Sequence, residues 1–154
     1  MGVTIKTKAY GEIEIDEKQI IDFSDGILGF DYVKRFALID TDDSSSPLKW
    51  LQAIDVSELA FVVIRTDEIM NNYELVVPSL DYESIDSTKG DDIVVMAIVT
   101  IPADPNEMTA NLQGPIIINL EKKKGKQAIS LSDKYTVRER IVDLMQASDQ
   151  REAK

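Results

Sequence analysis

Residues 93–101 read Ile-Val-Val-Met-Ala-Ile-Val-Thr-Ile, and Pro102 follows directly. The run is rich in β-branched residues and ends at a residue that cannot donate to a β-ladder, so it predicts a strand. It is too short to cross a bilayer as a helix, which takes roughly 20 residues. Residues 60–65, Ala-Phe-Val-Val-Ile-Arg, are apolar on both faces. We expect residues 60–65 to form a central strand and residues 93–101 the strongest strand of the sheet.

Shorter stretches on either side alternate apolar and polar residues with the period of two that is typical of strands. Residues 3–8 and 12–15 alternate around Tyr10-Gly11 and predict an N-terminal hairpin. Further strands are expected at residues 36–39, 48–52, 73–77, 113–119 and 126–131. Many short strands separated by Gly, Pro, Asn and Asp favour a barrel or sandwich over parallel βαβ units. The predicted fold class is mostly β, a small antiparallel barrel-like or sandwich-like domain.

One segment near the carboxyl end has the period of a helix. Its apolar residues are spaced as one helix face, at Val137, Ile141, Leu144 and Met145. Thr136 followed by Glu139 is a capping-box pattern, which satisfies two free N–H groups at a helix start. We therefore expect a short C-terminal helix that begins there. Weaker helix signals occur at residues 20–21 and 32–34.

The length and the lack of internal repeats or linkers indicate one domain, since single domains cluster near 100–150 residues. We expect a barrel-like domain over residues 1–147 and a polar tail over residues 148–154 that frays. No apolar stretch of the kind that a secretory signal requires follows the first residues. The expected location is therefore the cytoplasm.

The composition limits the possible functions. Of 154 residues, 17 are Lys or Arg and 28 are Asp or Glu, a formal net charge of -11. An acidic surface repels phosphate backbones and anionic membranes, so neither nucleic acid nor a membrane is an expected partner. With 0 His and 0 Cys, the chain cannot build a Ser-His-Asp or Cys-His centre. The composition thus points away from enzymes and from nucleic-acid-binding proteins.

The charge is unevenly distributed along the chain. Residues 1–120 carry 8 basic and 22 acidic side chains, whereas residues 121–154 carry 9 basic and 6 acidic ones. This polarity suggests a surface that attracts cationic proteins. An acidic surface also serves solubility alone, and the composition by itself leaves both interpretations open.

Two charged loops are candidates for ligand binding. Asp40, Asp42 and Asp43 bring together carboxylates of the kind that Ca²⁺ prefers, but the loop lacks the spacing of an EF-hand, and a solvated loop is the simpler interpretation. Residues 122–126, Lys-Lys-Lys-Gly-Lys, lack the earlier Gly of a phosphate-binding loop and lie between two predicted strands. We expect a basic hairpin turn there, and neither a metal nor a cofactor.

Two glycine-containing segments are more informative. Residues 23–30 read Phe-Ser-Asp-Gly-Ile-Leu-Gly-Phe, and two glycines in an apolar octet imply positive φ angles or close backbone approach. Such a segment can form a turn that plugs one end of a barrel. Residues 108–115, Met-Thr-Ala-Asn-Leu-Gln-Gly-Pro, lie just before a predicted strand. They form either an ordinary loop or an exposed strand edge, which is a template for pairing with a partner.

At these residues the sequence resembles the flagellar assembly factor FliW family. Matching stretches include residues 21–30, the Trp-Leu-Gln at residues 50–52, residues 59–63, 97–102, 108–119 and 125–127, and the Tyr-Thr-Val-Arg at residues 135–138. They occur in order over most of the chain, and the string Met-Thr-Ala-Asn-Leu within residues 108–119 is the most specific part.

The resemblance implies a β-barrel-like protein that is not an enzyme. FliW proteins bind the translational regulator CsrA, relieve its repression of flagellin mRNA, and also bind flagellin, so that CsrA and flagellin compete for them. Two other interpretations remain open: a chaperone that binds flagellin alone, and a metal-dependent enzyme that uses only Asp and Glu.

The candidate protein-binding residues combine expected exposure, acidity and an apolar anchor beside a strand: Asp104, Glu107, Met108, Thr109 and Asn111. The alternative is that this string fixes a tight turn and the register of the core.

Overall fold

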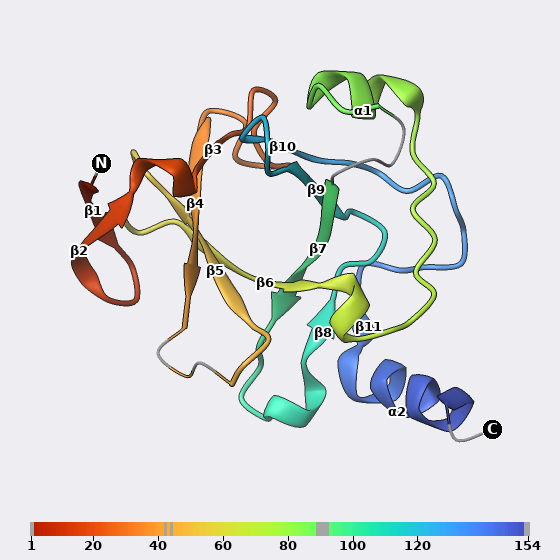
Figure 1. The fold of residues 1–154 in the computed structure, drawn as a ribbon. Helices are drawn as coiled ribbons and strands as arrows, with labels where there is room; N and C mark the ends of the chain where they lie inside the picture. The colour runs from red at the N-terminus through yellow and green to blue at the C-terminus, as the bar shows by residue number, and fades with distance from the viewer. Residues whose placement is uncertain (1, 42, 44, 89–92, 153–154) are drawn as a thin grey trace.

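The computed structural model describes residues 2–41, 43, 45–88 and 93–152, and its architecture depends on strand β7 (Ile93–Thr100) (Figure 1). Along one edge, β7 pairs with β6 (Ala60–Arg65). Along the other edge it pairs first with β9 (Ile116–Asn119) and then, at its carboxyl end, with β8 (Thr109–Ala110). The pairing with both β6 and β9 closes the sheet on itself.

The closed sheet is a seven-strand barrel. From β7 the ring continues in the order β6, β5 (Lys49–Ala53), β4 (Arg35–Asp40), β3 (Ile20–Asp22), β10 (Lys124–Gln127) and β9. Neighbouring strands are antiparallel except β10 and β3, which are parallel and pair at Lys124 and Asp22. The predicted mostly-β fold is confirmed, and of the two expected forms it is the barrel.

The N-terminal hairpin lies outside this ring (Figure 1). Its strands β1 (Gly2–Thr7) and β2 (Gly11–Asp16) form a separate two-stranded antiparallel sheet, as predicted from their alternation. Ile5 and Ile15 pack against Ala37 and Ile39 of β4. The hairpin thus buries the outer face of β4, whose alternate residue Phe36 faces the barrel interior.

Strand β7 is buried on both faces, which explains its nearly uninterrupted apolar sequence. Val94, Met96 and Ile98 belong to the interior core, together with Val63 of β6. Ala97 and Val99 belong to a second cluster on the outer face, which includes Ile141 of helix α2 (Ile141–Glu152). The outer cluster docks the carboxyl-terminal segment on the barrel, so α2 packs against an apolar strand face.

Residues 23–30, which follow β3, form a turn that plugs the barrel, as their two glycines suggest. We call them the plug segment. Phe23 is fully buried and meets Phe36 edge to face, with ring centroids 5.2 Å apart. Gly26 has φ +67°, and a Cβ atom there would lie 2.4 Å from the Asp31 Cα. Only glycine satisfies both constraints, so the turn that follows Phe23 has a fixed path.

Several predicted elements differ from the structure. Residues 73–77 were expected to form a strand; their burial alternates, but their one recorded backbone–backbone hydrogen bond is from Leu131 N to Val76 O, at 2.7 Å. The weak helix signal at residues 20–21 falls in β3, and residues 32–34 are not helical. Strand β10 ends at Gln127, short of the predicted residue 131.

Short elements were missed because pattern analysis needs longer windows. They are helix α1 (Ser79–Ser84), the 3₁₀ turns η1 (Glu17–Gln19), η2 (Thr66–Glu68) and η3 (Pro105–Glu107), and strands β8 and β11 (Glu139–Arg140).

The C-terminal helix is confirmed, but its predicted start is wrong. Glu139 Oε2 accepts from Thr136 N at 2.7 Å, as in a capping box, yet residues 139–140 form β11, which pairs with β8. The contact closes a turn before β11, and α2 begins at Ile141. Val137 is therefore 52% exposed rather than part of the buried helix face. Helix α2 ends at Glu152, so it continues through most of the expected polar tail.

None of the helices in the described ranges has the length and apolar character needed to cross a membrane.

Replacing Gly125 by Ala tests the plug. An added Cβ would lie 2.6 Å from Phe23 Cζ in the core, and Gly125 does not have a positive φ, so the cost is steric. We expect Gly125→Ala to lower the free energy of unfolding by about 1–3 kcal/mol, measured by urea denaturation. In a Phe23→Leu background the same substitution should cost less, because the smaller side chain leaves room. Equal costs in both backgrounds would contradict this packing.

Candidate protein-binding site

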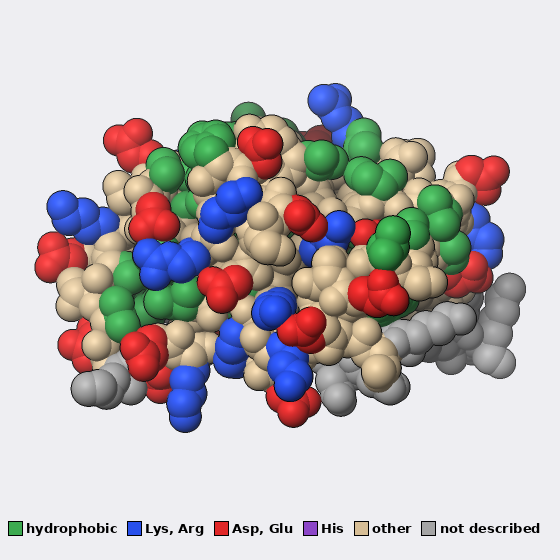
Figure 2. Space-filling view, turned by 90° about the horizontal axis from the view of Figure 1, so that it is seen from above, with side chains coloured by type: hydrophobic (Ala, Val, Ile, Leu, Met, Phe, Trp, Pro, Cys, Tyr) green, Lys and Arg blue, Asp and Glu red, His purple; other side chains and the backbone are tan. Residues whose placement is uncertain are grey.

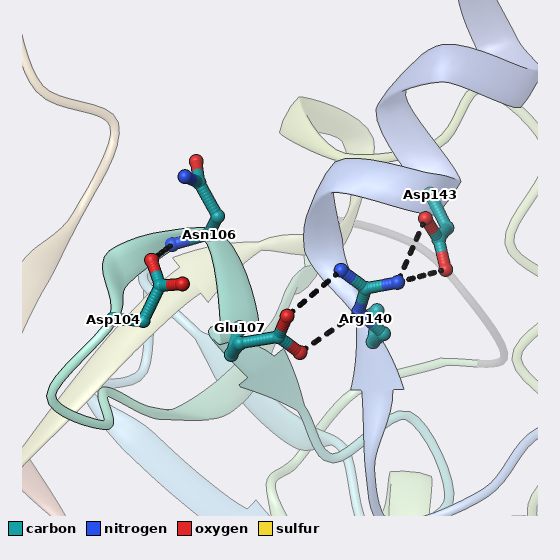
Figure 3. Close-up of polar contacts among 5 residues, drawn as sticks. All are labelled: Asp104, Asn106, Glu107, Arg140 and Asp143. Atoms are coloured by element: carbon teal, nitrogen blue, oxygen red, sulfur yellow. Dashed lines mark hydrogen bonds and ion pairs between the residues drawn. The ribbon is translucent and has the colours of Figure 1, made fainter.

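The first predicted site residue, Asp104, lies where the chain leaves β7 and enters η3 (Figure 3). Its Oδ1 accepts from Asn106 N at 3.0 Å, which makes Asp104 the N-cap of this turn. Pro105 suits the first position of the turn because its φ is already fixed and its missing N–H is not needed there. Asp104 is exposed, so its negative charge is presented to solvent at the end of the barrel.

Glu107 is also exposed, but an arginine compensates its charge (Figure 3). Its Oε2 lies 3.3 Å from Arg140 Nε, and Arg140 Nη1 lies 3.3 Å from Asp143 Oδ2. The network connects η3 to the start of α2. These side chains are about half exposed, so the ion pairs contribute little stability, of the order of 0–1 kcal/mol each. Of the two predicted acidic residues, only Asp104 has no cationic partner among the described contacts.

Met108 and Thr109 are half-buried parts of the scaffold. Met108 packs against the outer core cluster, and its carbonyl accepts from Ile141 N at 3.1 Å. Thr109 lies in β8, between Thr100 of β7 and Arg140 of β11. Of the two alternatives for residues 108–115, the exposed strand edge does not apply to β8, because both of its edges are paired.

Asn111 organises the turn that leads into β9. Its Oδ1 accepts from Gly114 N at 2.8 Å and from Gln113 N at 3.2 Å. Gly114 O in turn accepts from Gln127 Nε2 at 3.1 Å, and Gln127 Oε1 accepts from Leu28 N at 2.9 Å. A chain of hydrogen bonds thus connects the predicted site residue Asn111 to the plug segment. These hydrogen bonds favour the interpretation in which the string at residues 108–112 fixes a tight turn and the register of the core.

Lys126 is a second connecting residue that the sequence reasoning missed. Its Nζ lies 3.0 Å from Asp25 Oδ2 in the plug segment and 3.1 Å from Asp81 Oδ1 in α1. Burial alone would lower the pKa of Lys126, but the hydrogen bonds to both carboxylates outweigh it and raise that pKa. The ammonium group therefore stays charged and holds three segments together. In the sequence, Lys126 lies in the lysine-rich segment at residues 122–126 and in the family-like stretch at residues 125–127, and neither pattern indicates its two carboxylate partners.

Two tyrosines anchor residues 73–77 to the site segment. Tyr73 Oη donates to Leu112 O at 2.6 Å, and the rings of Tyr73 and Tyr135 lie 4.6 Å apart. Burial, with a smaller contribution from Tyr135, raises the pKa of Tyr73 well above its usual value, so the hydroxyl remains a donor. Tyr135 Oη accepts from Glu74 N at 2.9 Å. Residues 73–77 are thus held in place by side chains rather than by a β-ladder.

The acidic loop contains no recorded metal-type cluster in the ranges that the structure describes. Asp40 pairs with Lys49, and Asp43 accepts from the Ser45 hydroxyl at 2.6 Å. That bond and a second one from the Ser45 backbone lower the pKa of Asp43. Asp42 lies outside the described residues. The carboxylates of Asp40 and Asp43 thus have partners within the protein, Lys49 and Ser45.

The lysine-rich segment is a hairpin turn, as predicted. β9 and β10 pair on either side of it, and Lys123 at the turn has φ 57°. Lys124 Nζ lies 2.7 Å from Asp86 Oδ2. Figure 2 shows acidic and basic side chains intermixed on the face seen from above, so this end of the barrel does not present a field of one sign.

The fold and the site define a small, closed β-barrel protein whose predicted site residues build a surface segment between the barrel and its C-terminal helix. The family model described as FliW protein matches residues 4–141. The chain therefore belongs to the FliW family.

Relatives and a solved structure agree with this assignment. The chain is 44% identical to a flagellar assembly factor FliW of Leptospira biflexa, over 95% of each chain. It is 38% identical to one of Ruminiclostridium cellulolyticum, over 94% of this chain and 98% of the relative. A crystal structure of the flagellar assembly factor FliW superimposes with a TM-score of 0.82 at 34% identity, covering 90% of this chain and 96% of that one.

Substitution of Asn111 tests its role in the turn. Asn111→Ala removes the acceptor for the Gly114 and Gln113 N–H groups, so we expect the free energy of unfolding to fall by about 1–3 kcal/mol in urea denaturation. Asn111→Asp keeps an oxygen at this position and should retain most of the stability. If the Ala variant were as stable as the unmodified protein, Asn111 would not hold the turn.

Proposed function

We propose that this protein is a non-enzymatic flagellar assembly factor that acts by binding other proteins. Its relatives are named flagellar assembly factors rather than after a reaction, which supports this role. By resemblance to FliW, the first partner is a CsrA-type translational regulator, whose repression of flagellin mRNA is relieved on capture. The second partner is flagellin itself.

The observation that carries the proposal is the excess of negative charge in residues 1–120, which include every strand of the barrel except β10. Residues 1–120 carry 22 acidic against 8 basic side chains. Such a surface attracts a basic, RNA-binding protein over several ångströms and speeds its association. After capture, the same charge opposes the approach of RNA phosphates to the bound regulator. Repression is then relieved without direct occupation of the RNA site.

The two partners give a simple regulatory cycle. While flagellin accumulates in the cytoplasm, it occupies the factor and leaves the regulator free to repress translation. When flagellin is secreted, the factor becomes available, captures the regulator and allows more flagellin to be made. The synthesis of flagellin is thereby coupled to its use in assembly.

Of the predicted contact residues, the geometry most supports Asp104. It is exposed, caps only its own turn among the described contacts, and precedes half-buried Met108 by one 3₁₀ turn. Glu107, Thr109 and Asn111 remain part of the proposed surface, but each has a structural contact of its own within the fold.

Titration of the protein with a purified CsrA-type dimer at increasing ionic strength tests the function. Because long-range attraction is screened beyond roughly 10 Å at 0.1 M salt, we expect the association rate to fall steeply as salt rises. Stopped-flow mixing measures that rate. Binding to flagellin without binding to the dimer would instead favour a flagellin chaperone, and turnover that depends on a tightly held divalent metal would favour an Asp/Glu-based enzyme.

Two substitutions at Asp104 separate its charge from its capping role. Asn is as good an N-cap as Asp, so Asp104→Asn removes the charge and leaves the turn intact. We expect a modest loss of affinity for the CsrA-type dimer with Asn and a larger one with Lys, measured by calorimetry beside a melting curve.

Glu58→Lys, at an exposed position between β5 and β6, makes the same charge reversal as a control. If both Asp104 variants bind like the Glu58→Lys variant, Asp104 is not in the contact surface.

A further inference from the structure

Four large apolar side chains lie exposed beside the turn that Asn111 organises. Leu28 is 64% exposed, Val76 40%, Ile129 50% and Leu131 65%. Single exposed apolar residues are ordinary on protein surfaces, but a contiguous set marks a site of interaction. We call these four side chains the apolar row.

Hydrogen bonds to one extended segment, residues 127–131, bring the four residues of the row together. Ile129 and Leu131 alternate with buried Ala128 and Ser130, so they project from the same face of an extended segment. Leu131 N donates to Val76 O at 2.7 Å, which places Val76 beside Leu131 at one end. At the other end, Gln127 lies two residues before Ile129 and bonds Leu28 N. From residue 127 to 131 an extended chain spans about 13 Å, so the row is long enough for several side chains of a partner.

The row rests on a rigid support. Ala128 N donates to Pro115 O at 2.9 Å and Ser130 N to Gln113 O at 2.7 Å, so residues 128–130 continue the pairing of β10 with the chain before β9. Leu28 is fixed by the Gln127 amide, and the ion pair between Lys126 and Asp25 holds the plug segment on the same strand. A surface that is already ordered loses little conformational entropy on binding.

The row adjoins the candidate binding segment. Gln113, whose carbonyl accepts from Ser130 N, lies within the turn held by Asn111. The hydrogen bonds from Asn111 through Gly114 and Gln127 lead to Leu28. Asn111 therefore acts as a positioning residue for the row.

Charge around the row indicates what would cover it. Asp31 lines the same hollow as Leu28, and Asp133 follows two residues after Leu131; both are exposed, and neither forms an ion pair among the described contacts. Two neighbouring lysines are paired with carboxylates, since Lys126 pairs with Asp25 and Asp81 and Lys134 Nζ lies 2.8 Å from Glu74 Oε1. The local surface is thus apolar in the middle and acidic at its ends. It complements an apolar segment flanked by Lys or Arg.

We propose that the apolar row is a docking surface for an amphipathic, basic segment of a partner protein. The proposal rests on the proposed function, because the basic partner available there is the CsrA-type regulator. To the proposed function it adds the location of the docking surface and the kind of contact. The apolar side chains of the row provide the affinity, and Asp31 and Asp133 fix the orientation of the bound segment.

The test uses the full chain and the purified CsrA-type dimer in calorimetry at low salt. Both residues changed in the double variant Ile129→Ser/Leu131→Ser are exposed, so the melting temperature should stay close to that of the unmodified protein. We expect its affinity for the dimer to fall about tenfold or more, because a few apolar side chains carry most of the binding energy of an interface. Leu120→Ser, at a 41% exposed position beside the lysine-rich turn, is the control and should bind normally.

The outcomes separate this inference from the proposed function. If the unmodified protein and the double variant bind the dimer equally well, the row is not the docking surface, although the proposed function stands. If the double variant loses flagellin but keeps the dimer, the assignment of a basic occupant is overturned. If the unmodified protein does not bind the dimer at all, the proposed function fails and this inference with it.

Discussion

The pairing of β7 with both β6 and β9 is the constraint on which the rest of the structure depends. It turns a meander of short strands into a closed ring and removes the free edges that an open sheet would expose. Closure also gives each strand an inner and an outer face, and most of the outer faces are covered by other segments. The hairpin β1–β2 covers β4, and the carboxyl-terminal segment covers β6 and β7. The core is therefore distributed over several clusters rather than confined to the barrel interior.

The segment between β7 and β9 connects the barrel to the segments that surround the candidate site. This segment pairs through β8 at one end and turns at Asn111 at the other, and its hydrogen bonds reach Gln127 and Leu28. Most of residues 108–112, the string Met-Thr-Ala-Asn-Leu that resembles the family, are thus part of the structural support of the site. Asp104 and the apolar row lie outside this string, are exposed, and are the contacts that we propose for a partner.

Much of the fold was predictable from continuous apolar runs and from the alternation of apolar and polar residues. Residues 60–65 and 93–101 and the N-terminal hairpin are strands because their apolar periods match burial on one or both faces. Residues 73–77 show the limit of this reasoning, since their alternation reflects side-chain burial, and among the described residues the one backbone–backbone bond that joins them to another segment is from Leu131 N to Val76 O. The site was less predictable: Glu107 looked like a free acid, but Arg140, distant in sequence, compensates it. Likewise, no local pattern reveals that Gln127 meets Leu28 across the fold.

We propose that the acidic barrel works by exchanging protein partners, and that Asp104 and the apolar row are two of the places where a partner makes contact. Competition between the partners tests this claim most directly. A complex of the protein with a labelled CsrA-type dimer is titrated with monomeric flagellin, and fluorescence anisotropy follows the release of the dimer. The account predicts that flagellin displaces the dimer in a saturable manner. A dimer that never forms a complex, or one that stays bound while flagellin binds to the same molecule, would contradict it.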